Sequence, residues 1–250
     1  MNQTHHYRSV FISDLHLGTR HAQAGQLLEF LRDVECEHLF LVGDIIDGWA
    51  LKRRWNWPQP HSDVIQKLLR KARKGTKLTY ILGNHDEFVR RFLPLTLGDN
   101  ISIANEHTYI TKNGQQFLVT HGDFFDSITM TKKWLAKFGD VSYELLLRLN
   151  RPINVFRRLI GYKRFWSLSN FAKQNVKKAV MFIDDYETIL MTEASRRDFD
   201  GVICGHIHKA EHKNLDGVTY LNCGDWVESC SFVAETHEGE WKVVHYKAVL

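Results

Sequence analysis

The sequence lacks any apolar run long enough to cross a membrane, and it shows no segment typical of an exported protein. No stretch of its 250 residues approaches the 18 or more consecutive apolar residues of a membrane span. The N-terminal stretch, Met1 to Arg8, has no apolar signal-peptide core. Cysteine is scarce, since the four cysteines form no Cys-x-x-Cys pair and are too few for a disulfide scaffold. We therefore expect reduced, mostly buried thiols and a cytoplasmic protein.

One segment of the chain lacks acidic residues altogether. Between Arg148 and Lys178 there are nine Lys or Arg side chains and no Asp or Glu. The whole chain has a net charge of only +4, so the remainder is mildly acidic. The same segment contains five aromatic residues: Phe156, Tyr162, Phe165, Trp166 and Phe171. Such a segment suits contact with phosphates, an anionic membrane surface or a nucleic acid, and a solvated basic face over a hydrophobic core is the plain alternative.

The order of apolar segments indicates an α/β fold. Strand-like runs at Ser9–Ser13, His38–Val42 and Leu78–Leu82 alternate with helical patterns at Ala22–Val34 and Asp63–Lys74, which is typical of a partly parallel sheet. Later runs predict a second, mostly antiparallel sheet: Val202–Cys204, Thr219–Asn222, Ser231–Glu235 and Trp241–Tyr246. Helical spacing at residues 129–197 indicates an insertion. We interpret residues 1–250 as one domain that carries this insertion.

Chemically informative residues recur directly after the predicted strands. The fragments are Asp14-Leu15-His16, Gly43-Asp44-Ile45-Ile46-Asp47, Gly83-Asn84-His85-Asp86, His121-Gly122-Asp123 and Gly205-His206-Ile207-His208. Each fragment alone is more often a turn, a helix cap or a hydrogen-bonded core histidine. Five of them in order, each after an apolar strand, are hard to explain in that way. Because the carboxyl ends of strands form the ligand crevice of open α/β sheets, they predict one site.

The residue types in these fragments favour two metal ions. Carboxylate, imidazole and amide oxygen without thiolate suit Mn²⁺, Fe, Co²⁺, Zn²⁺ or Mg²⁺, and we expect Mn²⁺ first among them. Seven candidate ligands are too many for one tetrahedral zinc but suit two ions that share a carboxylate. Two ions about 3.5–4 Å apart lower the pKa of a water between them and offset charge on phosphoryl oxygens. The residue types therefore favour a site with two metal ions, which would suit the hydrolysis of a phosphoester.

In these motifs the sequence resembles the calcineurin-like metallophosphoesterase family, whose pattern is D-x-H, G-D-x-x-D, G-N-H-D/E, a histidine and then G-H-x-H. The resemblance implies a four-layer αββα sandwich of two sheets flanked by helices. It implies one ion held by Asp14, His16, Asp44 and His208. It implies a second ion held by Asp44, Asn84, His121 and His206, so that Asp44 bridges the two.

Four further motif residues receive expectations of their own. In the family, the histidine at the position of His85 donates to the phosphoryl group or to the leaving oxygen, although a structural histidine held by its acidic neighbour is the alternative. We expect Asp47 and Asp86 to orient imidazoles rather than to bind metal. Asp123 is either a residue of the same kind or a turn residue.

The insertion is similar to that of the bacterial UDP-2,3-diacylglucosamine diphosphatases of lipid A synthesis. This resemblance implies a helical lid over the acyl chains and the release of UMP and lipid X from a lipid-linked sugar nucleotide. It also allows contact with the anionic inner face of the cytoplasmic membrane. A helix over Phe165–Asp184 would place four candidate substrate contacts on one face: Asn170, Lys173, Gln174 and Lys177. One departure is that the best-defined branch has Arg after the metal-binding Asn, where this chain has His85.

Other activities stay open at this point. A phosphodiesterase acting on cyclic nucleotides or nucleic acid is the strongest rival, because a basic insertion also suits a phosphate backbone. Protein phosphatases usually have Arg where this chain has Gly48 and Glu where it has Asp86, which argues against that class. A metal-bearing protein without activity is disfavoured because no motif residue is missing.

Overall fold

The computed structural model describes residues 4–125, 183 and 186–246. The chain divides into two compact units, residues 1–123 with 190–250, and residues 124–189. Most of the second unit lies outside the described residues, as do Asn170, Lys173, Gln174 and Lys177, so the insertion predicted at 129–197 stays a prediction. Within the described ranges, no helix is long and apolar enough to cross a bilayer.

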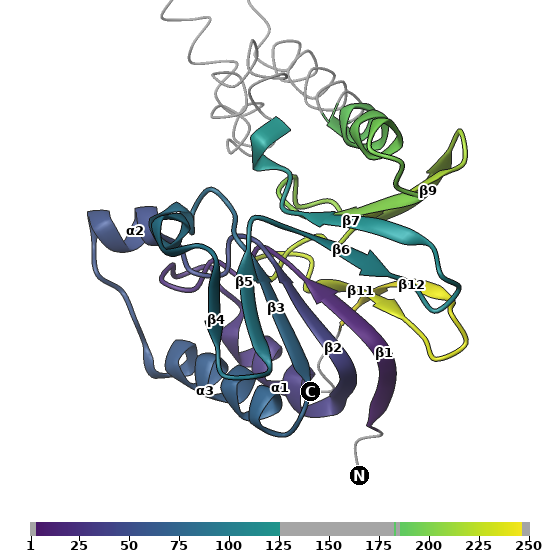
Figure 1. Ribbon diagram of the computed structural model, residues 1–250. Helices are drawn as coiled ribbons and strands as arrows, with labels where there is room; N and C mark the ends of the chain where they lie inside the picture. The colour runs from purple at the N-terminus through teal and green to yellow at the C-terminus, as the bar shows by residue number, and fades with distance from the viewer. Residues whose placement is uncertain (1–3, 126–182, 184–185, 247–250) are drawn as a thin grey trace, which may run out of the picture. The chain divides into compact units, whose positions relative to one another are not determined.

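The larger sheet of the first unit has seven strands in the order β12-β11-β1-β2-β3-β5-β4 (Figure 1). Their bounds are His5–Ile12 (β1), Val34–Val42 (β2), Lys77–Ile81 (β3), Leu95–Leu97 (β4), Ile101–Ala104 (β5), Ser231–Glu235 (β11) and Trp241–His245 (β12). Strands β1, β2, β3 and β5 run parallel, whereas β11 pairs antiparallel with β1. The carboxyl ends of β1, β2 and β3 therefore meet at one edge of the sheet.

The smaller sheet has five strands in the order β6-β7-β8-β10-β9. Their bounds are Glu106–Ile110 (β6), Gln116–Thr120 (β7), Gly201–Cys204 (β8), Glu211–Leu215 (β9) and Val218–Asn222 (β10). The three central strands, β7, β8 and β10, are parallel, and antiparallel hairpins add β6 and β9 at the edges. Here too the chain leaves neighbouring parallel strands on the same side.

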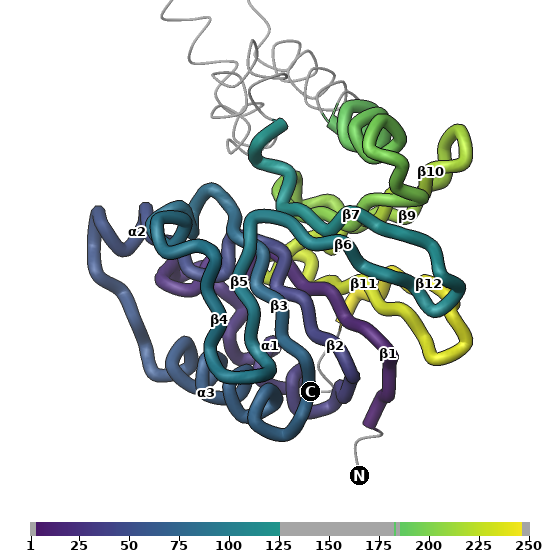
Figure 2. Tube along the Cα trace, viewed as in Figure 1, coloured from purple at the N-terminus to yellow at the C-terminus, as the bar shows by residue number. Residues whose placement is uncertain are grey.

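Side chains of the central strands alternate between two apolar cores, because successive residues of a strand point to opposite faces. Val10 and Ile12 of β1 join the core covered by helices α1 (Ala24–Asp33) and α3 (Gln59–Arg73). Those helices bury Leu27, Phe30 and Leu31, and Val64, Leu68 and Ala72, at the spacing of one helical face. Figure 2 shows both helices below the larger sheet. Each fully buried large apolar side chain contributes about 1.5–3 kcal/mol.

The second core lies between the two sheets. Phe11 of β1 stacks on Phe40 of β2 with ring centroids 4.5 Å apart. Both belong to the same buried cluster as Phe117 of β7 and Ile203 of β8. Residues 190–196 are helical and bury Leu190 and Ala194. In Figure 1 this helix lies on the side of the smaller sheet that faces away from the larger sheet. These layers agree with the αββα sandwich predicted from the sequence.

The C-terminal strands do not form the single antiparallel sheet that their sequence suggested. Strands β8 and β10 belong to the smaller sheet, whereas β11 and β12 extend the larger sheet beyond β1. The reason lies in the pattern of β11, which is apolar on both faces. Phe232 joins the core under the helices and Val233 joins the core between the sheets, so β11 is buried best beside β1.

Candidate metal centre

The five polar fragments follow five strands, and the structure divides these between the two sheets. The first three follow β1, β2 and β3 of the larger sheet, and the last two follow β7 and β8 of the smaller sheet. Backbone hydrogen bonds join the loops, since Asp14 N donates to Gly43 O at 3.0 Å and His16 N donates to Asp44 O at 2.9 Å. Gly205 N donates to His121 O at 3.3 Å within the smaller sheet. The sequence predicted that all five fragments lie at one edge of a sheet. The structure instead places them where two sheets meet.

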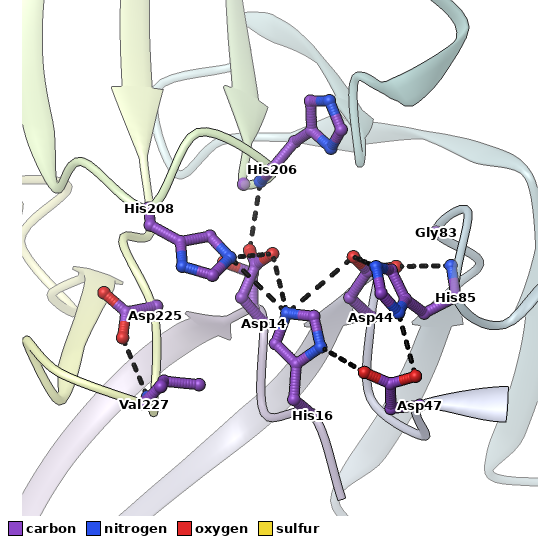
Figure 3. A network of polar contacts seen from close by, with 12 residues as sticks. Asp14, His16, Asp44, Asp47, Gly83, His85, His206, His208, Asp225 and Val227 are labelled. Atoms are coloured by element: carbon purple, nitrogen blue, oxygen red, sulfur yellow. Dashed lines mark hydrogen bonds and ion pairs between the residues drawn. The ribbon is translucent and has the colours of Figure 1, made fainter. Parts of the chain in front are cut away.

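Two buried carboxylates, Asp14 and Asp44, are held in the same way. Asp14 Oδ2 accepts a hydrogen bond from the backbone N–H of His206 at 3.0 Å. Asp44 Oδ1 accepts one from the backbone N–H of His85 at 2.9 Å. The other oxygen of each carboxylate faces imidazoles, which lie around the pair in Figure 3. Each carboxylate is thus fixed by the backbone through one oxygen and leaves the second for the centre.

The imidazoles are oriented through their Nδ1 atoms. Asp47 Oδ2 lies 3.2 Å from His16 Nδ1, and Asp47 Oδ1 lies 3.0 Å from His85 Nδ1 (Figure 3). His121 Nδ1 lies 3.0 Å from the carbonyl oxygen of Val42, to which it can only donate. In all three rings this leaves Nε2 directed at the carboxylates. A fixed tautomer with a free Nε2 is the usual state of a metal-binding histidine.

The inward-facing atoms form two groups that each suit a cation. Asp14, His16 and His208 make one group, in which His208 Nε2 is 3.1 Å from Asp14 Oδ1 and 3.4 Å from His16 Nε2. Asp44, His121 and His206 make the other, with His121 Nε2 at 3.3 Å from Asp44 Oδ2. His16, Asp47 and His85 also lie close together, but each oxygen of Asp47 already faces the Nδ1 of one ring, and Asp47 Oδ1 also accepts from Ala50 N.

Electrostatics show that the centre holds an excess of negative charge. Burial lowers the pKa of His121, but the carboxylates of Asp44 and Asp14 raise it to about 10. Burial likewise opposes protonation of His208, and Asp14 nevertheless raises its pKa to about 9. Burial also opposes ionisation of Asp14, but these imidazoles lower its pKa below the ordinary value. The carboxylates therefore favour positive charge beside the Nε2 atoms of these rings, which a divalent cation can supply.

One further atom supports a fit to metal ions. Asn84 Oδ1 is buried and has no hydrogen-bond partner among the described residues. A buried polar atom without a partner costs about 1–3 kcal/mol, unless an ion or a water satisfies it. Asn84 stands between Gly83 and His85 in the loop after β3. Amide oxygen, carboxylate and imidazole donors fit the hard or borderline divalent ions predicted from the sequence.

The backbone of this centre is strained at the residues predicted to bind metal. Eight non-glycine residues in the described part of the chain have a positive φ, and five of them are predicted ligands: Asp14, His16, Asp44, His206 and His208. Their φ values lie between 47° and 71°. Such conformations cost of order 1–3 kcal/mol each and cluster at functional sites. The spacing D-x-H and H-x-H thus turns consecutive ligands inward at an energetic cost.

Motif glycines allow the carboxylates to approach the neighbouring loops. A Cβ atom on Gly83 would lie 2.2 Å from Asp44 Oδ1. A Cβ atom on Gly205 would lie 2.5 Å from Asp14 Oδ2. Because real Cβ atoms do not come so close, any side chain at these positions displaces a central carboxylate. The glycines of G-N-H-D and G-H-x-H therefore serve the centre and not merely a turn.

Asp86 differs from the expectation that it orients an imidazole. It is fully buried, and it accepts hydrogen bonds from the backbone N–H groups of Ile45 and Ile46 and from the hydroxyl of Tyr80. Burial raises its pKa to about 6. Asp86 therefore holds the loop after β2 in place beside the loop after β3. The reason is its place in the turn, where backbone donors lie closer to it than any ring.

Asp123, which the sequence left open, forms an ion pair. Its Oδ2 lies 2.6 Å from Arg90 Nη2, in the short helix η1 (Glu87–Phe92) that follows G-N-H-D. This pair joins the loop after β7 to the segment after β3.

Two residues near the centre escaped the sequence reasoning. Asp225 lies beside His208 in Figure 3 and raises the pKa of that ring together with Asp14. Asp225 stands in Gly224-Asp225, shortly after β10. This repeats the pattern of Gly43-Asp44 after β2, so the sequence alone could have identified Asp225 as a candidate site residue. Trp49, in helix α2 (Gly48–Arg53), packs on His85 with ring centroids 4.3 Å apart. Nothing in its local sequence marks Trp49.

Comparisons with known proteins agree with this geometry. The sequence profile of the calcineurin-like phosphoesterases matches residues 7–210. The UDP-2,3-diacylglucosamine hydrolase of Psychromonas ingrahamii is 27% identical over 238 residues, covering 90% of this chain and 92% of that protein. The enzyme of the same name from Neisseria gonorrhoeae is 24% identical over 227 residues, covering 87% of this chain and 89% of that protein.

The contacts of Asp47 predict what its loss would do. Asp47→Asn keeps one acceptor oxygen but turns the other into an amide donor, so it cannot serve as acceptor for the Nδ1 atoms of both His16 and His85, and it leaves Asp14 and Asp44 in place. We expect metal affinity to fall about 10–100-fold, as is usual when an outer partner of a metal-binding histidine is removed. Competition with a fluorescent chelator measures this, and Asp99→Asn, an exposed aspartate, is the matched control. Unchanged affinity in Asp47→Asn would contradict the proposed orientation.

Proposed function

This chain belongs to the calcineurin-like phosphoesterase family and is a metal-dependent hydrolase of phosphoesters or pyrophosphates. From that premise we propose that it cleaves the pyrophosphate of UDP-2,3-diacylglucosamine. The products would be UMP and lipid X, as in lipid A biosynthesis. The observation that carries the proposal is the pair of donor groups on Asp14 and Asp44, joined to the names of the relatives that match across most of the chain.

We assign the two donor groups to two ions. One ion would be held by Asp14, His16, Asp44 and His208, and the other by Asp44, Asn84, His121 and His206. Support for the bridge comes from Asp44 Oδ2, which lies 3.3 Å from His121 Nε2 and 3.9 Å from His16 Nε2, one ring from each group. When bound, such ions supply a water of lowered pKa and offset charge on the phosphoryl oxygens. Mn²⁺ is our first choice among ions that suit these donors.

His85 is proposed as the group that donates to the phosphoryl or leaving oxygen. Its Nδ1 is held by Asp47, its Nε2 lies 3.8 Å from Asp44 Oδ2, and its side chain remains 22% exposed. Asp47 therefore fixes the ring at the edge of the centre while the ring stays accessible to a substrate. Trp49 covers one side of the ring and keeps its own Nε1 bonded to Glu87. The ring is thus held on two sides before any substrate binds.

The substrate assignment rests on the relatives and on the basic segment of the sequence. Proteins named for UDP-2,3-diacylglucosamine hydrolysis match about nine-tenths of the chain. Cations and aromatics between Arg148 and Lys178 suit a phosphorylated, acylated substrate, and they also suit peripheral contact with an anionic membrane. Within that segment we propose Asn170, Lys173, Gln174 and Lys177 as substrate contacts. The same charge pattern favours a phosphodiesterase of cyclic nucleotides or nucleic acid as the second candidate.

A side-by-side assay separates these activities. The Mn²⁺-loaded protein is given UDP-2,3-diacylglucosamine, the same molecule without acyl chains, a cyclic nucleotide and single-stranded DNA. We expect hydrolysis of the acylated substrate with the highest kcat/KM. Loss of the acyl chains should lower kcat/KM, because each buried CH₂ contributes about 0.8 kcal/mol. Turnover indifferent to acyl chains, with DNA bound in a strongly salt-dependent manner, would establish the second candidate instead.

Replacement of His85 tests its assigned role. His85→Ala should retain both metal ions while kcat falls about 10²–10⁴-fold, the usual contribution of a positioned proton donor. Turnover of an aryl phosphodiester and elemental analysis on the same sample measure the two quantities. His212→Ala, which removes an exposed histidine of β9, is the control. A fall in the metal content of His85→Ala would make His85 a ligand and refute the assignment.

A further inference from the structure

An aromatic side chain, Trp49 of helix α2, stands at the edge of the metal centre. Its indole packs on His85 with ring centroids 4.3 Å apart, and His85 Nε2 lies 3.8 Å from Asp44 Oδ2. One imidazole therefore separates the indole from a central carboxylate. Even with this contact, Trp49 remains 44% exposed. A large apolar ring next to the centre is thus available to a molecule that binds there.

The contacts of α2 with η1 hold Trp49 in place before a ligand binds. Trp49 Nε1 donates to Glu87 Oε1 at 2.9 Å, which fixes the orientation of the indole. Gly48 N donates to His85 O at 3.1 Å, and a Cβ atom on Gly48 would lie 2.7 Å from the ring of Phe88. The start of α2 is therefore packed closely on the segment that carries His85. A ring held in this way loses little conformational entropy when a ligand packs on it.

The neighbours of Trp49 on α2 suit a nucleotide better than an acyl chain. Lys52 and Arg53 follow Trp49 by three and four residues, so they stand on the same side of the helix, and both are exposed. Helix α2 itself contains no acidic residue. A flat indole next to cations matches a flat base that is joined to a phosphate. An acyl chain would instead need apolar walls around it.

We propose that Trp49 is a specificity-determining residue, on which the base of a nucleotide stacks while the phosphate of that nucleotide lies at the metal centre. The inference rests on the proposed function, in which UMP is a product, and it deepens that function by assigning a contact to the base. Stacking on an aromatic side chain is available to every base, because each base has a π face. Trp49 therefore favours phosphoesters of nucleotides over phosphoesters that lack a base.

A role limited to positioning His85 leads to a different expectation. If the indole only holds His85, its loss lowers the turnover of every substrate and leaves the affinity for a nucleotide unchanged. If a base stacks on the indole, its loss weakens the binding of ligands that have a base and spares ligands that have none. Ribose 5-phosphate is UMP without its base, so this pair of ligands separates the two roles.

The measurement is isothermal titration calorimetry of the full-length, Mn²⁺-loaded protein with UMP and with ribose 5-phosphate. Trp49→Ala should weaken the binding of UMP about 5–150-fold, the usual loss when a stacking aromatic is replaced by alanine, and leave that of ribose 5-phosphate unchanged. Trp49→Phe keeps a flat ring and should recover most of the affinity for UMP, whereas Trp49→Leu should not. Trp55→Ala, which removes a tryptophan that is 75% exposed, is the control and should bind both ligands as the wild type does.

Three results would each overturn the proposal. They are equal affinity of the wild type for UMP and ribose 5-phosphate, equal affinity of Trp49→Phe and Trp49→Leu for UMP, and an equal loss of both ligands in Trp49→Leu. The comparison of Trp49→Phe with Trp49→Leu keeps the test decisive even where Trp49→Ala fails to fold. Because the titration uses no acylated substrate, its failure leaves the hydrolase assay unaffected, and failure of the lipid assay leaves the titration unaffected.

Discussion

The carboxylates of Asp14 and Asp44 are buried where the two sheets meet, and buried negative charge is costly unless it is paired or hydrogen-bonded. The surrounding structure therefore has to stabilise these two charges. Asp14 is fully buried and Asp44 nearly so. Each is met first by a backbone N–H, from His206 and His85, and then by imidazoles. The imidazoles of His121 and His208 in turn have raised pKa values because of these carboxylates. A pair of divalent ions would satisfy the same demand without protons.

The rest of the architecture follows from holding those two groups at fixed positions. Parallel strands deliver the loops to one place, the core between the sheets keeps the strands in register, and Asp86 ties the loop after β2 to the loop after β3. The positive φ angles of five predicted ligands cost backbone free energy, and they direct these side chains into the metal centre. Tertiary packing has to offset that strain, and the strands beside the centre, such as β1, contribute to it by burying apolar side chains on both faces.

The sequence was informative wherever one pattern carried both structure and chemistry. Strand-then-ligand fragments located β1, β2, β3, β7 and β8 and the residues that gather at their ends. The pairing of β11 with β1 was not predictable in this way, because the register of a strand that is apolar on both faces depends on partners far along the chain. Asp86 was misjudged for a related reason, since its hydrogen bonds go to backbone groups that only the folded turn brings near. The contact of Trp49 with His85 arises from packing between elements, which no local motif records.

The central claim is that Asp44 is shared by two ions, and metal stoichiometry tests it most directly. Elemental analysis of the wild type should give about two divalent ions per chain. Asp44→Asn keeps the size of the side chain but removes the charge that both ions would share, so it should lose more than one ion. Asp216→Asn, at an exposed turn where Asn tolerates the same positive φ, should retain both. Two ions retained in Asp44→Asn would contradict the shared centre.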